Sequence, residues 1–510
     1  MASAVEPYNL LTPRQRLIGG LALGLANFMV VLDLTIANVS VPHIAGNLGI
    51  SPSQGTWVIT SYAVAEAIVV PLTGWLANRF GAVRMFVFSA IGFGLFSILC
   101  GSSVTLQMLV ICRIGQGLCG GPLMPLTQML LMRVYPPEKR AQAMGIWAMT
   151  SLMGPATGPI VGGFISDNLS WHWIFFINVP VVIFCAVAAR ALLKPVETPT
   201  ARTPIDIVGL ILLIIWIGCL QIMLDLGREH DWFADPLILG LGITAAIFFA
   251  IFIIWELTDD HPIVDLRVFR HRGFSVGVMV LALGFGTYFA GIVVIPQWMQ
   301  VSLGYTATQA GVVVAMTAMM GLFVARFPPL LINKMDPRIL LSLGLFWIGC
   351  CTLIRVRWTS GTDYFSLMLP QMMMGLGMPF FFIIVNAMSL SSVPPRELAS
   401  AAGLSNFTRT IGLAIATSIA MTYWNDQARV AGSELAGKIN YGETSATLAE
   451  RGFSGDQIRM VVSRLVDQEA LTLATDKMFL IAGVLTWAVA LWVWMIPKPK
   501  RPIGFGAGGH

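Results

Sequence analysis

The sequence predicts an all-α membrane protein with fourteen transmembrane helices. Of its 510 residues, 56% are hydrophobic and 11% are charged, whereas roughly 25% of the residues of a typical soluble domain are charged. The mean hydropathy is +0.77. A soluble chain this apolar could not cover its surface with polar groups. The apolar residues also gather in runs of about 20, the length that crosses a bilayer.

Fourteen runs have this length. The first eight cover residues 17–41, 56–77, 83–101, 106–132, 143–165, 173–193, 205–226 and 236–257. The other six cover residues 274–298, 307–332, 338–356, 364–392, 399–423 and 478–496. An even number of spans puts both termini on one side of the membrane.

The Lys and Arg residues indicate which side that is. They concentrate in the termini and in the even-numbered loops, while the short odd-numbered loops carry only Arg228, Arg355 and Arg357. Because positively charged loops stay in the cytoplasm, both termini are predicted to be cytoplasmic. The net charge of +5 therefore reports membrane topology and does not indicate a nucleic-acid partner.

Two loop patterns occur twice in the same order. Asn78-Arg79 after span 2 corresponds to Asn333-Lys334 after span 10. Pro136-Pro137 after span 4 corresponds to Pro394-Pro395 after span 12. Parallel repeats of this kind are typical of two-lobed transporters. The predicted domains are an N-terminal six-helix lobe at 1–198, an inserted helix pair at 199–262, and a C-terminal six-helix lobe at 263–510 that includes a periplasmic loop at 424–477.

Several charged residues lie inside predicted spans, where a charge costs about 2.5–3.5 kcal/mol and needs a reason, and three of them are candidates for proton coupling. Asp33 in span 1 and Arg113 in span 4 lie at comparable depth, so the two side chains could pair across a cavity. Glu66 lies near the middle of span 2. A carboxylate balanced between burial and a nearby positive charge can take up and release a proton. The alternative is that Asp33 or Glu66 only binds a neighbouring helix.

Span 5 carries a run of glycines and prolines. Gly154, Gly158 and Gly162 recur every four residues and form one helix face, which allows a neighbouring helix to approach closely. Prolines remove hydrogen-bond donors and bend a helix. The run therefore predicts a packing hinge, although ordinary tight packing gives the same spacing. Its other members are Pro155, Pro159 and Gly163.

The connection between spans 2 and 3 is a short basic turn that is a candidate gating loop. Gly81 suits a position that needs positive φ. The other residues assigned to this loop are Gly74, Asn78, Arg79 and Arg84.

Several side chains inside the spans are candidates for a substrate pocket. Methionine thioethers adapt to varied apolar shapes, and Met149 and Met153 lie in span 5. Polar residues in three other spans complete the candidate set, although each methionine fits core packing equally well. These are Gln116, Asp225 and Asn386.

Four motifs resemble those of one transporter family. Leu32-Asp33 to Val39 is similar to its first-helix motif, and Gly74 to Arg84 is similar to its loop 2–3 motif. Arg113 with Gln116-Gly117 is similar to its fourth-helix motif, and Gly154 to Gly163 resembles its antiporter motif in span 5. By these residues the chain resembles the major facilitator superfamily, and within it the fourteen-span drug:proton antiporter family of the EmrB type.

The resemblance implies a proton-coupled multidrug efflux transporter in the bacterial inner membrane. It would export amphipathic and hydrophobic toxic compounds, driven by the proton gradient without a cofactor, with Asp33, Glu66 and Arg113 in proton coupling. It would be the inner-membrane component of a tripartite pump, with a periplasmic membrane-fusion adaptor of EmrA type and a TolC-type outer-membrane channel. Asn78 departs from the superfamily, which usually has Asp there, so the charge that would stabilise one gating state is missing.

Two other functions stay open. The chain could be a dedicated exporter of a natural metabolite or siderophore. It could also be a non-transporting membrane scaffold or sensor that binds partners through residues 424–477. An enzyme is not expected, because the sequence has no P-loop, HExxH or GxSxG motif and no cluster of metal ligands.

Overall fold

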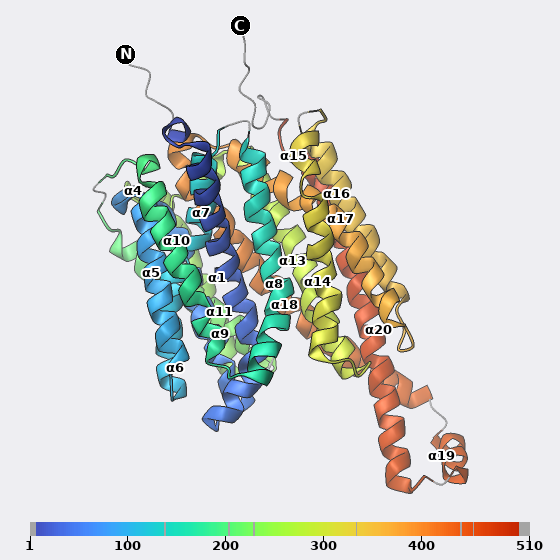
Figure 1. Cartoon of the computed structure of the whole chain (residues 1–510). Coiled ribbons are helices and arrows are strands. Elements are labelled where there is room, and N and C mark those ends of the chain that lie inside the picture. The colour runs from blue at the N-terminus through green and yellow to red at the C-terminus, as the bar shows by residue number, and fades with distance from the viewer. Residues whose placement is uncertain are drawn as a thin grey trace, which may run out of the picture.

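The computed structural model describes residues 7–136, 139–201, 204–227, 230–332, 334–438, 441–451 and 453–498. These residues form a bundle of helices without β-strands (Figure 1). The first and last described residues lie at the same end of the bundle, which we call the terminus end. A helical hairpin projects from the opposite end (Figure 1).

The first half of the chain forms ten α-helices with short 3₁₀ turns between some of them. These helices are α1 (Pro13–Leu48), α2 (Pro52–Gly55), α3 (Trp57–Val69), α4 (Thr73–Phe80), α5 (Ala82–Gly101), α6 (Leu106–Gly120), α7 (Leu123–Val134), α8 (Arg140–Asn168), α9 (Trp173–Phe176) and α10 (Asn178–Leu192). The turns are η1 (Pro7–Leu10), η2 (Val70–Leu72) and η4 (Lys194–Val196).

The second half begins with a helix pair and continues with a second set of long helices. These helices are α11 (Ile207–Leu226), α12 (Pro236–Thr258), α13 (Arg272–Val301), α14 (Ala307–Val324), α15 (Phe327–Leu331), α16 (Pro337–Ile354), α17 (Tyr364–Ser391), α18 (Leu398–Lys438), α19 (Tyr441–Glu450) and α20 (Gly455–Trp492). The 3₁₀ turns are η5 (Trp232–Ala234), η6 (Leu266–Arg270), η7 (Arg355–Arg357), η8 (Pro395–Glu397) and η9 (Val493–Met495).

Among the described residues, twelve helical segments are long and apolar enough to cross a membrane. The two remaining predicted spans, 143–165 and 399–423, fall on α8 and α18. Both are long helices, of 29 and 41 residues. They carry more glycine and polar residues than the other spans because they pack inside the bundle, α8 between α1 and α14 and α18 between α13 and α20. The predicted all-α membrane fold is confirmed, and these two helices are its less apolar members.

The helices pack as two groups with a pair between them. In the first group α1 packs on α8 and α10, and α3 packs on α6. In the second group α16 packs on α17 and α20, and α13 packs on α18. The pair α11–α12 contacts both groups through α11, which packs against α3 and also touches α18. The two groups meet along α8 and α14, while the exact domain boundaries stay a prediction.

The segment expected as a loop at 424–477 is helical in the structure. Helix α18 continues to Lys438, and α20 already begins at Gly455. The N-cap of α20 is Ser454, whose side chain accepts a hydrogen bond from Gln457 N in a capping box. Capping of this kind satisfies backbone groups that the first helical turn leaves free. The two spans therefore extend as a helical hairpin beyond the bundle (Figure 1).

The glycine face of α8 lies directly on α1. A Cβ atom at Gly154 would lie 2.5 Å from Val31 Cγ1, and one at Gly158 would overlap Thr35 Oγ1. At Gly162 it would meet the carbonyl oxygen of Ile36 at 3.0 Å. The predicted close approach of a neighbouring helix is therefore present. Gly163 lies off this face, with open space around its Cβ position.

Substituting Gly158 by Ala should destabilise the α1–α8 contact by about 1–3 kcal/mol, the usual cost of overpacking a core. The new methyl group would also meet the backbone carbon of Thr35 at 3.1 Å, which cannot rotate away. Gly163→Ala is the matched control on the same helix. The measurement is thermal unfolding of the purified full chain in detergent. Equal melting temperatures for the two variants would contradict the packing role of this face.

Candidate functional site

The predicted pair of Asp33 and Arg113 is present at the centre of the N-terminal group of helices. Arg113 Nη1 lies 2.6 Å from Asp33 Oδ2, and neither side chain is exposed. Asp33 comes from α1 and Arg113 from α6, so the ion pair joins two helices. A buried ion pair is expensive to desolvate unless further hydrogen bonds satisfy both groups. The surrounding side chains supply these bonds.

Two amide side chains complete the shell of Asp33. Gln116 Nε2 donates to Asp33 Oδ1 at 3.1 Å, and Asn178 Nδ2 donates to the same oxygen at 2.8 Å. Both amides also donate to Ser97 Oγ at 3.0 Å. The carboxylate thus accepts three N–H hydrogen bonds, and α1, α5, α6 and α10 are joined in one network. Both carboxylate oxygens of Asp33 therefore accept hydrogen bonds in this conformation.

The sequence analysis did not identify Asn178 and Ser97 as part of the site. Each is a single polar residue in an apolar run, a pattern that most helices of this chain contain. Only the packing of α5 and α10 against each other turns both side chains toward Asp33.

Arg113 is held by three further groups. Its Nε donates to the carbonyl oxygen of Val58 at 3.0 Å, and its Nη1 also donates to Gln116 Oε1 at 2.8 Å. Its guanidinium lies 4.2 Å from the ring centroid of Tyr62, and cation–π contacts of this kind stabilise a desolvated guanidinium. Arg113 Nη2 has no hydrogen-bond partner among the residues that the structure describes, so its two N–H groups are left without an acceptor in a buried site.

Glu66 is buried in the same region, but it is not part of the Asp33 network. Its side chain is 3% exposed, and it has no side-chain hydrogen bond to another described residue. The charges that act on it are those of Arg409, Arg113 and Asp33. Glu66 and Asp33 are therefore separate carboxyl groups that interact electrostatically and do not share a hydrogen bond.

A polar bridge connects the two groups of helices. Gln128 of α7 donates through Nε2 to Asn386 Oδ1 of α17 at 3.0 Å. Asn406 of α18 donates to Gln128 Oε1 at 2.7 Å. All three residues are buried. The predicted pocket residue Asn386 thus forms part of a contact between the groups, and Gln128 and Asn406 are partners that the sequence analysis missed.

Arg409 lies next to this bridge. Its Nη2 donates to Asn406 Oδ1 at 3.2 Å and contacts Met124 Sδ at 3.5 Å. The guanidinium lies 5.6 Å from the ring of Trp147 and 5.1 Å from the ring of Phe285. Arg409 therefore touches helices of both groups at their interface, a position that explains why a charge is kept inside α18.

The remaining predicted pocket residues lie on several helices, and their grouping as a pocket stays a prediction. Gln116 belongs to the Asp33 network. Met149 is buried and Met153 is half-buried on α8, while Asp225 near the end of α11 interacts with Gln221 and with Thr60 of α3. None of the predicted pocket residues lines a large apolar cavity elsewhere in the described structure.

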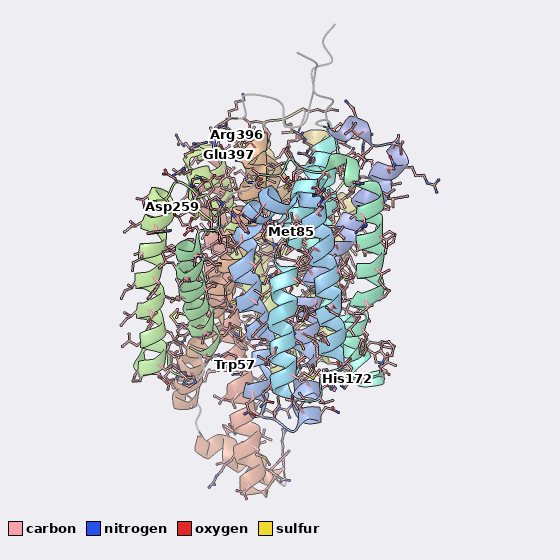
Figure 2. All side chains as sticks on the ribbon, turned by 90° about the vertical axis from the view of Figure 1, so that its left-hand side faces the viewer. Trp57, Met85, His172, Asp259, Arg396 and Glu397 are labelled. Atoms are coloured by element: carbon pink, nitrogen blue, oxygen red, sulfur yellow. The ribbon has the colours of Figure 1, made fainter. Side chains whose placement is uncertain are left out.

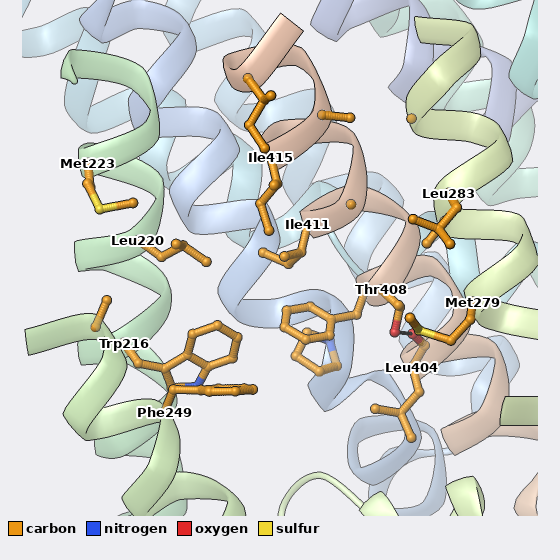
Figure 3. Close-up of a pocket in the computed structure, with 18 of the residues that line it drawn as sticks. Trp216, Leu220, Met223, Phe249, Met279, Leu283, Leu404, Thr408, Ile411 and Ile415 are labelled. Carbon is orange, nitrogen blue, oxygen red and sulfur yellow. Dashed lines mark hydrogen bonds between the residues drawn. The ribbon is translucent and has the colours of Figure 1, made fainter. Parts of the chain in front are cut away.

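That cavity lies between the inserted pair and the second group of helices. It has a volume of about 1080 Å³ and is lined by residues of α11, α12, α13, α18 and α20. Figure 3 shows Trp216 and Phe249 on one side, Leu283 on the other, and Ile411 and Ile415 of α18 between them. Its lining is almost wholly apolar, so it differs in chemistry from the Asp33 site.

The predicted gating loop is anchored by a carboxylate that the sequence analysis did not identify. Gly81 has φ +90°, as predicted. Glu197 accepts hydrogen bonds from Val83 N at 2.8 Å and Arg84 N at 3.0 Å, and so caps α5, where negative charge is favoured. A Cβ atom at Gly81 would lie 2.8 Å from Glu197 Oε1. The turn is therefore tied to the segment after α10.

The other residues of this loop make different contacts. Arg79 lies 5.3 Å from the ring of Trp75, and the Asn78 carbonyl oxygen accepts a bond from Ala201 N at 2.9 Å. A Cβ atom at Gly74 would lie 2.9 Å from the Cα of Ser400. Gly74 thus lets α4 touch the start of α18, which is a second contact between the two groups at the terminus end.

A charged cluster lies at the same end of the bundle, where Figure 2 shows Arg396 and Glu397. Arg270 Nη2 lies 2.6 Å from Glu397 Oε1, and His271 Nε2 lies 3.0 Å from Glu397 Oε2. Partial burial acts to raise the pKa of Glu397, but the His271 hydrogen bond and the charge of Arg270 outweigh it and lower the pKa. The cluster ties η6 to the start of α18 as long as Glu397 is ionised.

The family model described as Major Facilitator Superfamily matches residues 23–417. The chain belongs to the major facilitator superfamily. Among the described residues of this major facilitator chain, no group of three or more His, Cys, Asp or Glu side chains could hold a metal ion.

Curated relatives match along almost the whole chain. The multidrug export protein EmrB of Escherichia coli strain K12 is 42% identical over 97% of this chain and 98% of its own length. The fatty acid resistance protein FarB of Neisseria gonorrhoeae is 41% identical over 96% of this chain and 97% of its own. The predicted resemblance to EmrB-type members of the superfamily is therefore confirmed.

Solved structures agree in fold. A double-tryptophan mutant of XylE has a TM-score of 0.59 and 13% sequence identity, over 95% of this chain and 97% of that chain. A mutant of the peptide transporter POT in complex with sulfate has a TM-score of 0.58 and 15% identity, over 94% of this chain and 96% of that chain. At these identities the likeness concerns the fold alone.

The buried pair should show strong coupling in a double-mutant cycle. Asp33→Asn or Arg113→Gln alone leaves a buried charge without its partner, which costs about 3–5 kcal/mol, whereas the double variant removes both charges and should recover much of that loss. The control is the partly exposed pair of Asp336 and Arg338, with N–O distance 3.0 Å, for which we expect coupling under about 1 kcal/mol. The measurement is thermal unfolding in detergent. Additive losses at Asp33 and Arg113 would contradict a coupled pair.

Proposed function

We propose that this chain is a proton-coupled multidrug efflux transporter that exports amphipathic and hydrophobic compounds. The observation that carries the proposal is the buried pair of Asp33 and Arg113, in a major facilitator chain whose EmrB relative is named for multidrug export. Burying a carboxylate and a guanidinium inside a membrane costs free energy, and charged residues at such positions mark functional sites. With bacterial relatives over nearly the whole chain, we place it in the bacterial inner membrane with both termini in the cytoplasm.

The proton step is proposed to occur at Asp33. In this conformation both carboxylate oxygens of Asp33 accept N–H hydrogen bonds, three in all. A movement of α1 against α6 would withdraw Arg113 and let water protonate the carboxyl group. The Glu66 carboxyl accepts no hydrogen bond from the described residues, so it is available to hold a proton while Asp33 is paired. The two carboxyls would then be occupied in alternation, with the proton gradient as the energy source and no cofactor.

Opening of the terminus end requires the contacts between the two groups to break. These are the bridge of Gln128, Asn386 and Asn406 and the contact of Gly74 with Ser400. We propose that the glycine face on α8 allows the accompanying movement against α1. In this movement the gating loop would travel together with α4, and Glu197 would keep it attached to the start of α5.

We also propose that the chain is the inner-membrane part of a tripartite pump. The hairpin formed by the extensions of α18 and α20 leaves the bundle at the end opposite the termini (Figure 1). It is the part of the chain best placed to bind a periplasmic adaptor of EmrA type. A TolC-type outer-membrane channel would complete the pathway.

A second candidate is a dedicated exporter of one class of natural compound. The observation that favours it is the similarity to FarB, which is named a fatty acid resistance protein. Strong transport of fatty acids with poor transport of unrelated drugs would favour this second candidate over multidrug efflux.

The test is drug-induced proton efflux from acid-loaded inverted vesicles that contain the full chain. We expect wild type to give the signal and Asp33→Asn to lose it at matched expression, because Asn cannot exchange a proton. Asp260→Asn is the control, since Asp260 is exposed and lies outside the network. Glu66→Gln tests the second carboxyl group.

If Glu66→Gln loses the signal and Asp33→Asn retains it, the coupled proton binds at Glu66 of α3 and not at Asp33. No signal in wild type for a broad panel of lipophilic drugs would contradict multidrug efflux. Vesicles without the chain give the background proton leak.

A further inference from the structure

The cavity between the inserted pair and the second group of helices is an elongated cleft. Its lining on α18 extends from Leu404 to Tyr423, a distance of about 28 Å at the rise of 1.5 Å per residue of an α-helix. The hydrocarbon core of a bilayer is about 30 Å thick. The cleft therefore has nearly the height of the membrane interior.

The cleft offers an occupant few hydrogen-bonding groups. The hydroxyls of Thr287 and Thr408 line it, and each donates to the backbone of its own helix, at 3.0 Å and 2.8 Å, so that only its oxygen can take further bonds. Trp216 Nε1 has no hydrogen-bond partner among the described residues, and Tyr423 lies at one end of the lining. The rest of the lining is apolar and suits hydrocarbon chains better than ordered water, because a buried water needs two to four polar partners.

The cleft has a narrow shape with aromatic and aliphatic walls. Trp216 and Phe249 form one wall, Leu283 belongs to the other, and α18 forms the floor (Figure 3). Its volume of about 1080 Å³ exceeds the roughly 300–1,000 Å³ of compact ligand pockets. Phe249 is 42% exposed and Ile419 is 61% exposed, so the cleft is open on the side that faces the membrane.

The inserted pair has few direct contacts across this cleft. In the described part of the chain α12 packs mainly on α11, and it has no extensive contact with α13 or α20. A void between these helices would leave the lining atoms without dispersion partners. Two hydrogen bonds attach the pair to α18, from Trp232 Nε1 to Thr422 Oγ1 at 3.1 Å and from Ser418 Oγ to the Leu224 carbonyl oxygen at 3.0 Å. Apolar material in the cleft would supply the packing that α12 lacks against α13 and α20.

We propose that the cleft is a binding site for bilayer phospholipid, whose hydrocarbon chains form the packing surface between the inserted pair and α13, α18 and α20. The height of the cleft admits chains from both leaflets placed end to end. The polar headgroups stay at the membrane surface, beyond the apolar lining. This cleft is thus a lipid site rather than the drug pocket, and this assignment does not depend on the proposed transport activity.

The test uses a phospholipid with a photoreactive diazirine on its acyl chain, added in trace amount to the full chain in lipid nanodiscs. After illumination, peptide mass spectrometry measures labelling of residues 411–420 of α18 and of the outward faces of α5 and α6. Ala246→Trp places an indole in the cleft from α12, because Ala246 lines it. Ile247→Trp is the matched control, since Ile247 is 52% exposed and does not line the cleft.

We expect Ala246→Trp to lower the labelling of α18 about tenfold, the change that a loss of 1.4 kcal/mol in binding produces. Ile247→Trp should match wild type, and labelling of α5 and α6 should be equal in all three proteins. Ile419→Trp narrows the cleft from α18 and gives the same test if Ala246→Trp does not fold. Native mass spectrometry after detergent exchange should find phospholipid retained by wild type and Ile247→Trp only.

Three outcomes would overturn the proposal. Labelling of α18 that is unchanged in both cleft variants would mean that no chain occupies the cleft. Displacement of the label by a saturating amphipathic drug would make the cleft a drug site. Crosslinks between copies of the protein through residues 411–420 would assign the cleft to a dimer contact.

Discussion

The arrangement of the first group of helices depends on keeping Arg113 inside the membrane. A guanidinium cannot lose its charge at any physiological pH, so α6 can be buried only where that charge has partners. Asp33, the Val58 carbonyl and the Tyr62 ring supply them from α1 and α3. Asp33 in turn requires donors, and Gln116 and Asn178 provide them. One buried charge thus fixes the relative positions of α1, α3, α6 and α10.

This dependence links stability to transport. A buried network whose polar groups hydrogen-bond to one another is rigid, and removing one group destabilises the fold because its partners lose their hydrogen bonds. In the proposed mechanism Arg113 withdraws from Asp33, and a proton then replaces it as the partner of the carboxylate. The residues that hold these helices together would thus also control their separation. Glu66 and Arg409 lie outside this network, nearer to the interface of the two groups, where a change of charge acts on the contact between them.

Much of this arrangement could be predicted from the sequence. Apolar runs separated by basic loops predict the spans, because the membrane requires about 20 apolar residues for each. The depths of Asp33 and Arg113 along their spans predict that they can meet. Four-residue spacing predicts the glycine face of α8, and the positive φ of Gly81 follows from its place in a tight turn. Each of these features follows either from the spacing of residues along one helix or turn, or from the free-energy cost of placing a charge inside the membrane.

The partners could not be predicted in the same way. Asn178, Ser97 and Gln128 are isolated polar residues whose roles depend on how distant helices rotate against each other. Glu197 caps α5 across more than one hundred residues of sequence. The segment 424–477 is expected from the sequence as a loop outside the membrane, and α18 and α20 continue into it as a helical hairpin. The capping box of Ser454 and Gln457 that starts α20 can be seen in the sequence, but the limits of an apolar run do not show how far a helix continues beyond the membrane. The grouping of the five candidate pocket residues stays a prediction.

The central claim is that Asp33 exchanges the proton that drives transport. Infrared difference spectroscopy of the full chain in lipid tests it most directly, by following the C=O stretch of a protonated carboxyl group when a transported cation such as tetraphenylphosphonium is added. The account predicts a band that is lost on binding in wild type and in Glu66→Gln, and that is absent in Asp33→Asn. A band that persists unchanged in Asp33→Asn would contradict the claim and assign the proton to another carboxyl group.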